Sequence, residues 1–230
     1  MRLLSIETAT SVCGVALLTD DVLQTEESVE ARNIHAERLL GMIDGTLRTS
    51  GLRVRDLDAV AISIGPGSFT GLRIGLSVAK GLVFGLEIEM AAVPTLEALA
   101  WRLTDPEAGD ASPYVLAAID ARRDEVYCQL FRRSDRALVA SGPPQDLHVP
   151  ALHELLEGKQ VTVTGDGAEK VLSVSPPGVR LSPARAGFGG CSAATVGLLG
   201  GRLLRAGQGA DPATLEPWYI KEFFLRTASL

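Results

Sequence analysis

The chain has few of the residues on which metal centres, disulfide frameworks and nucleic-acid-binding surfaces depend. Its 230 residues include 3 cysteines and 3 histidines. The cysteines lie far apart in apolar segments, at Cys13, Cys128 and Cys191, which predicts reduced core residues in a cytoplasmic protein. A formal net charge of −6 argues against a chain that binds a nucleic-acid backbone by itself, because such chains need basic patches to neutralise phosphates.

Long uncharged apolar runs are also missing. No window long enough to cross a bilayer is both apolar and free of charge, so we expect no membrane span. The first residues, Met1–Glu7, include an acid and are typical of a strand rather than a secretory signal. Hydrophobic residues make up 46% of the chain, which is ordinary for a globular protein of one large domain or two small ones.

The most distinctive segment is Gly65–Gly75, with the sequence GPGSFTGLRIG. It follows a strand-like run and opens an apolar helix that should end near Leu86. The first two glycines flank Pro66 and should allow a tight turn, and the last two, Gly71 and Gly75, should allow another backbone to approach the helix. The segment matches neither the Walker phosphate loop nor the Gly-x-Ser-x-Gly nucleophile elbow. Its turn, which we call the glycine loop, consists of Gly65, Pro66, Gly67, Ser68, Phe69, Thr70 and Gly71.

Apolar periodicity predicts the elements of the first half of the chain. Asn33 is the predicted cap of the first helix, and Thr95 that of the third. The segment 104–113, rich in proline and acids, is the predicted domain linker. The expected strands cover 3–8, 13–19, 22–29, 59–64 and 88–93, and the expected helices cover 33–50, 71–86 and 95–103.

The second half repeats this order. A strand, a polar turn and a second strand place Asp120 where the first half has Glu7, and VTVTGDG at 161–167 echoes AISIGPG at 61–67. Such an internal repeat is an architectural signal. The two strands of this second hairpin are expected at 114–121 and 126–132.

Two duplicated β-β-β-α-β-α domains are the plan of the actin, hexokinase and Hsp70 (ASKHA) superfamily, in which a nucleotide lies between the domains. We therefore predict an α/β protein with domains at 1–103 and 114–230. A helix is expected at 192–205, and the aromatic segment Glu216–Lys221 should pack back on the fold.

Four segments, in order along nearly the whole chain, resemble the bacterial TsaB family, also called YeaZ. Glu7 stands where that family usually carries Asp, and Lys221 where it more often carries Arg; both substitutions keep the charge. The segments are Ile6–Thr10, Gly65–Gly75, Ala118–Arg122 with Glu125–Tyr127, and Glu216–Tyr219.

The resemblance implies a function and a set of partners. TsaB-like chains are non-catalytic subunits that work with TsaD, TsaC and TsaE in threonylcarbamoylation of the adenosine next to the anticodon in tRNA. The implied partners are TsaD and TsaE homologues, with tRNA contacted only through the complex, and a second copy of the chain when it is alone.

The helix at 71–86 is apolar almost all round, so both of its faces should be covered. One face would rest on a sheet, and the other would meet either a partner or this chain's own neighbouring helix. The resemblance favours the partner. The predicted interface residues are His35, Leu39, Ile43, Arg73, Leu76 and Lys80.

Two acids are the main candidates for chemistry. Glu7 and Asp120, with Thr8 and Thr10, would lie at the nucleotide cleft of this fold, where opposed acids can hold Mg²⁺. The second hairpin turn, ARRDE at 121–125, has no glycine, and its side chains would block a phosphate tail. We therefore expect a degenerate cleft with both acids bonded to turn amides, no cofactor, and at most weak nucleotide binding.

Metal chemistry is not expected either. His35 stands alone, and His148 and His153 are separated by Pro150, so no histidine pair has ligand spacing. The segment Gly187–Gly190 is either the remnant of an adenosine-contacting loop or a flexible linker. The functional alternative is an ATP-dependent phosphotransferase or ATPase of the same fold.

Overall fold

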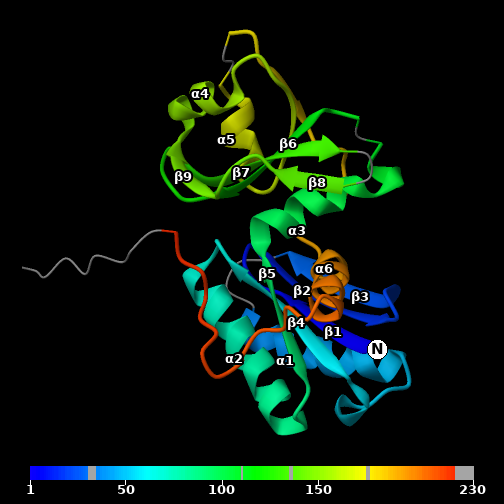
Figure 1. The fold of residues 1–230 in the computed structure, drawn as a ribbon. Helices are drawn as coiled ribbons and strands as arrows, with labels where there is room; N and C mark the ends of the chain where they lie inside the picture. Colours follow the sequence, from blue (N-terminus) through cyan, green and yellow to red (C-terminus); the bar gives the residue numbers. More distant parts are fainter. Residues whose placement is uncertain (31–34, 110, 135–136, 175–176, 221–230) are drawn as a thin grey trace, which may run out of the picture.

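A computed structural model describes residues 1–30, 35–109, 111–134, 137–174 and 177–220. Its strands form two sheets, each covered by helices, with helix α3 between them (Figure 1). The predicted cap Asn33 and the motif residue Lys221 lie outside the described residues.

The first sheet has the strand order β3-β2-β1-β4-β5. The hairpins β1–β2 and β2–β3 are antiparallel, and β4 runs parallel to both β1 and β5. The three antiparallel strands predicted for the N-terminal segment are thus confirmed. The strands are β1 Arg2–Glu7, β2 Val12–Thr19, β3 Val22–Glu30, β4 Ala59–Gly65 and β5 Glu89–Pro94.

Helices cover both faces of this sheet. Leu4 and Ile6 of β1 pack with helices α1 and α2, whereas Leu3 packs on the opposite face with α6, because successive strand residues point to opposite faces. The helices are α1 His35–Thr49, α2 Phe69–Leu86, α3 Thr95–Trp101 and α6 Ala193–Arg205.

The second sheet repeats the first. Its order is β11-β10-β6-β7-β8, with β9 also paired to β7, and β10 runs parallel to β6 as β4 does to β1. The duplication predicted from the sequence is therefore present in the strand order. The elements are β6 Tyr114–Asp120, β7 Glu125–Ser134, β8 Ala137–Ala140, β9 Gln145–His148, β10 Gln160–Thr164, β11 Arg180–Pro183, α4 Leu152–Leu156 and α5 Ala168–Leu172.

The predicted linker separates the strands of the two sheets, but 114–230 does not pack as one unit. Helix α6 follows the strands of the second sheet in sequence but packs on the first sheet. Its residues Val196 and Leu199 lie in the core that contains Leu3 and Leu18. The physical reason is that the first sheet has two apolar faces, and α1 and α2 cover one of them. How the chain divides into independently folding domains remains a prediction.

Two helix starts differ from those expected. Helix α2 begins at Phe69 because the side chain of Ser68 caps it, accepting a hydrogen bond from Gly71 N at 3.2 Å. Thr95 does not cap α3; Pro94 precedes the helix without a side-chain bond. The hydroxyl of Thr95 instead accepts a hydrogen bond from Gly65 N at 3.0 Å.

By length and composition alone, α2 is apolar and long enough to cross a membrane. A core helix of a layered fold meets the same criteria, so this is weak support for a membrane span. In the structure α2 packs against the first sheet through Leu72, Leu76 and Val83, which are buried. The three cysteines are free and buried, which confirms them as core residues.

Candidate functional site

The glycine loop joins the end of β4 to α2 and lies against the turn that follows β1. Gly65 has a φ of 117°, in the region that side chains other than glycine rarely adopt. Ser68 N donates a hydrogen bond to Ala9 O at 2.6 Å. The amides of Gly65, Ser68 and Gly71 are therefore all used inside the chain.

Close packing explains the remaining glycines of the segment. A Cβ atom at Gly71 would collide with the carbonyl oxygen of Thr8, one at Gly75 with the Thr8 hydroxyl, and one at Gly67 with Ala9 O. The backbone approach expected at Gly71 and Gly75 is thus confirmed. The segment docks α2 onto the β1–β2 turn, which places Glu7 and Thr8 beneath it.

The two predicted acids end corresponding strands, and each is bonded to its own turn. Glu7 is fully buried, and its Oε1 accepts a hydrogen bond from Ala9 N at 2.6 Å. Asp120 Oδ1 accepts hydrogen bonds from Arg122 N and from Lys170 Nζ, both at 2.6 Å. The expectation that both acids are polar strand ends bonded to turn amides is confirmed.

The second turn adopts a left-handed conformation without glycine, with φ of 71° at Arg122 and 49° at Arg123. Lys170 supports it by donating to Arg123 O as well as to Asp120. The turn amides at Arg122 and Glu125 are bonded to Asp120 and to Arg122 O, so they do not point at a ligand.

Two acids whose pKa values are raised lie where the two halves meet. Burial raises the pKa of Glu7 from the ordinary 4.5 to about 7, against the opposing effect of the Ala9 amide, and the charge of Asp166 adds to the rise. Asp166 is exposed, and its pKa is raised by partial desolvation, to which the nearby charges of Asp120 and Glu30 add. Glu7 Oε2 has no hydrogen-bond partner among the described residues. Neither acid supplies the positive charge that a polyphosphate requires.

A cleft of about 460 Å³ lies between the two halves. Of the four predicted cleft residues, Thr10 lines it; Glu7 and Thr8 are fully buried, and Asp120 is partly exposed beside Lys170. The cleft is lined by Thr10, Ser11, Val12, Ser28, Glu30, Leu99, Arg102, Asp166, Cys191 and segment 184–190 apart from Phe188.

Two arginines of the cleft were not predicted. Arg102 donates to Gly187 O at 2.6 Å and to Gly190 O at 2.7 Å, so the Gly187–Gly190 segment is held in place rather than being a free linker. Arg185 donates to Glu107 O at 2.6 Å. Neither arginine belongs to a motif, whereas Asp166 could have been found because it lies in the Gly-x-Gly echo of the second half.

The fold family implies a nucleotide with Mg²⁺, and the residues present do not fit one well. The turn amides described above are bonded internally, both arginines donate to backbone carbonyls, and the nearby side chains of Glu7, Asp120 and Asp166 are acidic. Within the described ranges, no three His, Cys, Asp or Glu side chains gather into a group that could hold a metal ion.

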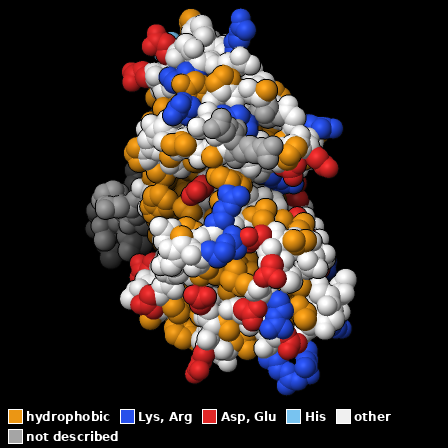
Figure 2. All heavy atoms as spheres, turned by 45° about the vertical axis from the view of Figure 1, so that its right-hand side comes forward, with side chains coloured by type: hydrophobic (Ala, Val, Ile, Leu, Met, Phe, Trp, Pro, Cys, Tyr) orange, Lys and Arg blue, Asp and Glu red, His pale blue; other side chains and the backbone are white. Residues whose placement is uncertain are grey.

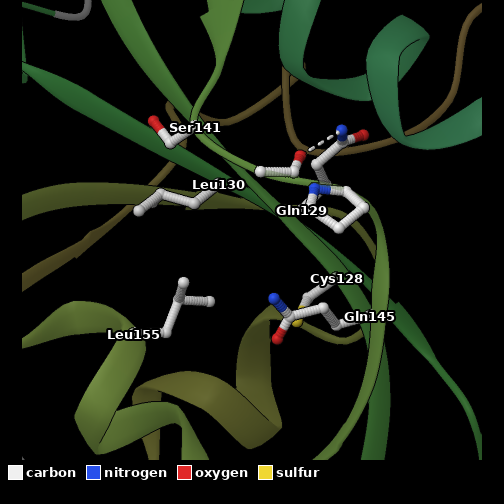
Figure 3. Close-up of a pocket in the computed structure, with 8 residues that line it drawn as sticks. Cys128, Gln129, Leu130, Ser141, Gln145 and Leu155 are labelled. Carbon is white, nitrogen blue, oxygen red and sulfur yellow. Dashed lines mark hydrogen bonds between the residues drawn. The ribbon is translucent and has the colours of Figure 1, made fainter.

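A second hollow lies beside β7 in the second sheet, where Cys128, Leu130 and Leu155 face it (Figure 3). Gln129 donates a hydrogen bond to Gly142 O at 2.9 Å along its wall. Its volume of about 30 Å³ matches a single water molecule, so it is too small for a substrate.

The predicted interface residues need correction. His35, Leu39, Ile43 and Leu76 are buried in this chain's own core, because α1 and α2 turn these positions toward the first sheet. His35 Nε2 lies 3.2 Å from Val12 O. Arg73 is exposed and Lys80 half-exposed, so these two remain accessible to a partner.

The opposite side of the same helices carries exposed apolar residues among charged side chains such as Glu37, Arg38 and Asp44. The exposed fraction is 62% at Leu40 and 59% at Phe84, and no other group lies within 4 Å of the positions that a Cβ would take at three glycines. We call this surface the outer face; it comprises Leu40, Gly41, Gly81, Phe84 and Gly85, with the half-exposed Ile74, Val78 and Leu82.

Charged side chains of both signs are mixed on the face of the molecule shown in Figure 2, with hydrophobic side chains between them. No single basic patch dominates this view. On this face, therefore, the surface lacks the concentrated positive charge typical of a protein that grips a phosphate backbone alone.

Comparison with known proteins places these features in a class. A Listeria monocytogenes protein described as a candidate N-acetylmannosamine kinase matches 90% of this chain and 100% of its own, with a TM-score of 0.50 and 10% identity. At that identity the likeness concerns the fold alone. Together with the duplicated sheets, it defines an α/β protein of the ASKHA type, which confirms the predicted fold class.

Proteins with higher sequence identity to this chain show which family within this fold class it belongs to. Residues 28–160 match the family model "TsaD: tRNA N6-adenosine threonylcarbamoyltransferase". The "tRNA threonylcarbamoyladenosine biosynthesis protein TsaB" of Escherichia coli is 38% identical over 170 residues, which are 71% of each chain. That of Haemophilus influenzae is 40% identical over 138 residues, covering 60% of this chain and 57% of its own. The structure "YeaZ from Pseudomonas aeruginosa" covers 95% of this chain and 99% of its own, with 30% identity and a TM-score of 0.81. The chain belongs to the TsaB (YeaZ) family.

Proposed function

We propose that this chain is a non-catalytic subunit required, with a TsaD homologue, for threonylcarbamoylation of the adenosine next to the anticodon in tRNA. Membership of the TsaB family and the printed function of its relatives support the pathway. The observation that carries the non-catalytic role is that both predicted acids are occupied within the chain: Glu7 and Asp120 each accept a hydrogen bond from an amide of their own turn.

The cleft gives no support to the alternative of a phosphotransferase or ATPase. In-line phosphoryl transfer depends on cations and amides that neutralise developing charge. Here the acid Glu7 is buried and Asp166 is exposed, neither can supply positive charge, and Arg102 is bonded to backbone carbonyls. Nucleotide binding by the isolated chain should accordingly be weak.

We propose that the partner binds the outer face. An exposed apolar patch of this kind marks a protein–protein contact more often than an ordinary surface does. Leu40 and Phe84 supply large side chains, and the glycines let a second backbone approach. In this proposal TsaD and TsaE homologues complete the complex, which carries the contacts to tRNA and works in the cytoplasm; the isolated chain pairs with a second copy of itself through the same face.

The partner surface is tested by Phe84→Glu. A carboxylate in a desolvated apolar contact is strongly unfavourable, so we expect the variant to lose both self-association and binding to the TsaD homologue while it stays folded. Light scattering after mixing the purified chains measures both. Leu76→Glu is not a suitable test, because Leu76 is buried and a carboxylate there should unfold the chain.

The matched control is Val139→Glu on β8, since Val139 is also an exposed apolar residue, at 49%, but lies on the other sheet. It should bind as the wild-type chain does. Full binding by Phe84→Glu, with an unchanged mass of the complex, would move the interface away from the outer face.

A further inference from the structure

The aromatic segment Glu216–Tyr219 resembles a family motif, and neither the cleft nor the outer face explains it. After α6 the chain runs back across the first sheet, where Ala210 N donates to Met90 O at 2.7 Å. It then passes beside α2 (Figure 1, red), where Trp218 N donates to Ile64 O, also at 2.7 Å. The segment thus ends next to the glycine loop.

Its contacts with the glycine loop are specific. The carbonyl oxygen of Trp218 lies 2.5 Å from the position that a Cβ at Gly65 would take, so only glycine fits there. The Tyr219 ring lies 5.2 Å from the Phe69 ring, between centroids, and its hydroxyl accepts a hydrogen bond from Arg73 Nε at 3.0 Å.

Arg73 completes the cluster. Its guanidinium carbon lies 3.7 Å from the centroid of the Phe69 ring, so one cation contacts both the loop and the C-terminal segment. Residues 146 positions apart in sequence therefore form one interlocked group at the first turn of α2. That turn also holds the capping bond from Gly71 N to Ser68 Oγ.

The segment is a surface feature and not a core element. Glu216 and Trp218 are exposed, whereas Pro217 and Tyr219 are half-buried. Surface segments held by few contacts open at low free energy, whereas the helix they touch is anchored by Leu72 and Leu76 in the core. The cluster therefore connects a part of the fold that opens easily to the loop that docks α2.

We propose that Glu216–Tyr219 is a strap that holds the glycine loop and the first turn of α2 in place, so that displacing the strap loosens this end of α2. The consequence for a partner rests on the proposed function: because Ile74 and Val78 of the outer face lie in the part of α2 that follows this end, release of the strap would weaken partner binding. Coupling of this kind is reciprocal. Loosening the loop must loosen the strap as well.

Hydrogen exchange on the full chain, read by mass spectrometry, tests the strap without any partner. The informative amides are Ser68 N, Leu72 N and Trp218 N, which have defined acceptors in Ala9 O, Ser68 O and Ile64 O. Tyr219→Ala should raise exchange at Ser68 and Leu72 by about tenfold. Tyr219→Phe, which keeps the ring and loses the hydroxyl, should raise it less. Arg73→Gln should raise exchange at Trp218.

Arg205→Gln is the matched control, because it removes an exposed ion pair with Asp21 at the far end of α6 and should change none of these amides. Peptides covering β10 should also be unchanged in every variant, which excludes global unfolding. If Tyr219→Ala speeds exchange in 216–219 alone and leaves 65–72 as in the wild type, the strap proposal is wrong.

Partner binding is a separate readout. Tyr219→Ala should weaken binding to the TsaD homologue by about tenfold or more, as expected when a coupled surface is disordered. If the wild-type chain does not bind that homologue at all, the proposed function fails, while the exchange result still decides whether the strap exists. Wild-type affinity in a variant with the faster exchange would refute the consequence for the partner.

Discussion

Gly71→Ala is expected to lower the free energy of unfolding by about 3 kcal/mol, at the upper end of overpacking effects. The added Cβ would collide with the carbonyl oxygen of Thr8 and would lie 3.3 Å from the Ser68 side chain, a tight contact. A backbone carbonyl cannot rotate away as a flexible side chain does, so α2 would have to move off the β1–β2 turn. Urea denaturation followed by circular dichroism measures the loss.

The matched control is Gly81→Ala on the same helix. No other group lies within 4 Å of a Cβ at Gly81, and alanine is the better helix former by up to about 1 kcal/mol. The control should therefore be as stable as the wild type or more so. Equal destabilisation by the two substitutions would show that helix propensity, and not the contact with Thr8, decides the effect.

Glu7→Gln is expected to stabilise the chain at pH 8 by about 3 kcal/mol and to change little at pH 4. Burial raises the folded-state pKa of Glu7 from 4.5 to about 7. Below pH 4.5 both the folded and the unfolded chain carry the proton. Between pH 4.5 and pH 7 the unfolded chain loses this proton while the folded chain keeps it, so the free energy of unfolding falls as pH rises. Above pH 7 the folded chain carries the buried charge, and the full loss of stability remains. Glutamine keeps an oxygen for Ala9 N and carries no charge.

Chemical denaturation at several pH values measures this difference. Glu37→Gln, on the exposed side of α1, makes the same chemical change without burial and serves as the control. A difference between Glu7→Gln and wild type that does not grow between pH 4 and pH 8 would contradict the raised pKa of Glu7.

The repeat and the glycines allowed most of the fold to be predicted from the sequence. Strand periodicity and the Gly-x-Gly echo predicted both hairpins. Gly71 and Gly75 predicted a close backbone contact but not the residue that makes it. Thr8 precedes Gly71 by more than sixty residues in sequence. A local pattern can therefore indicate that some neighbour is close, but it cannot identify Thr8.

The position of α6 could not be predicted. Apolar periodicity does not indicate which sheet a helix covers, and α6 packs on the face of the first sheet that α1 and α2 leave open. For the same reason the buried side of α1 was mistaken for a partner surface. Leu39 and Ile43 were predicted as interface residues, but apolar periodicity does not tell whether a sheet or another protein covers such a face.

In the cleft, the sequence located the two strand-end acids but not the arginines. Glu7 and Asp120 lie at equivalent points of the repeat, so their bonds to turn amides followed from the hairpin geometry. Arg102 donates hydrogen bonds to the backbone carbonyls of Gly187 and Gly190. Every residue has a backbone carbonyl, whatever its side chain. A contact of this kind therefore requires no particular residue type at 187 or 190, and the sequence alone does not predict it.

The central claim is that this chain is required for threonylcarbamoylation but does not perform it. The most direct measurement is a reconstitution with TsaC, TsaD and TsaE homologues, ATP, threonine, bicarbonate and tRNA, in which modified adenosine is quantified by mass spectrometry with each protein omitted in turn. We expect no modification without this chain, none with this chain alone, and restoration by wild type and by Glu7→Gln but not by Phe84→Glu. Full modification in its absence, or transfer by the isolated chain, would contradict the account.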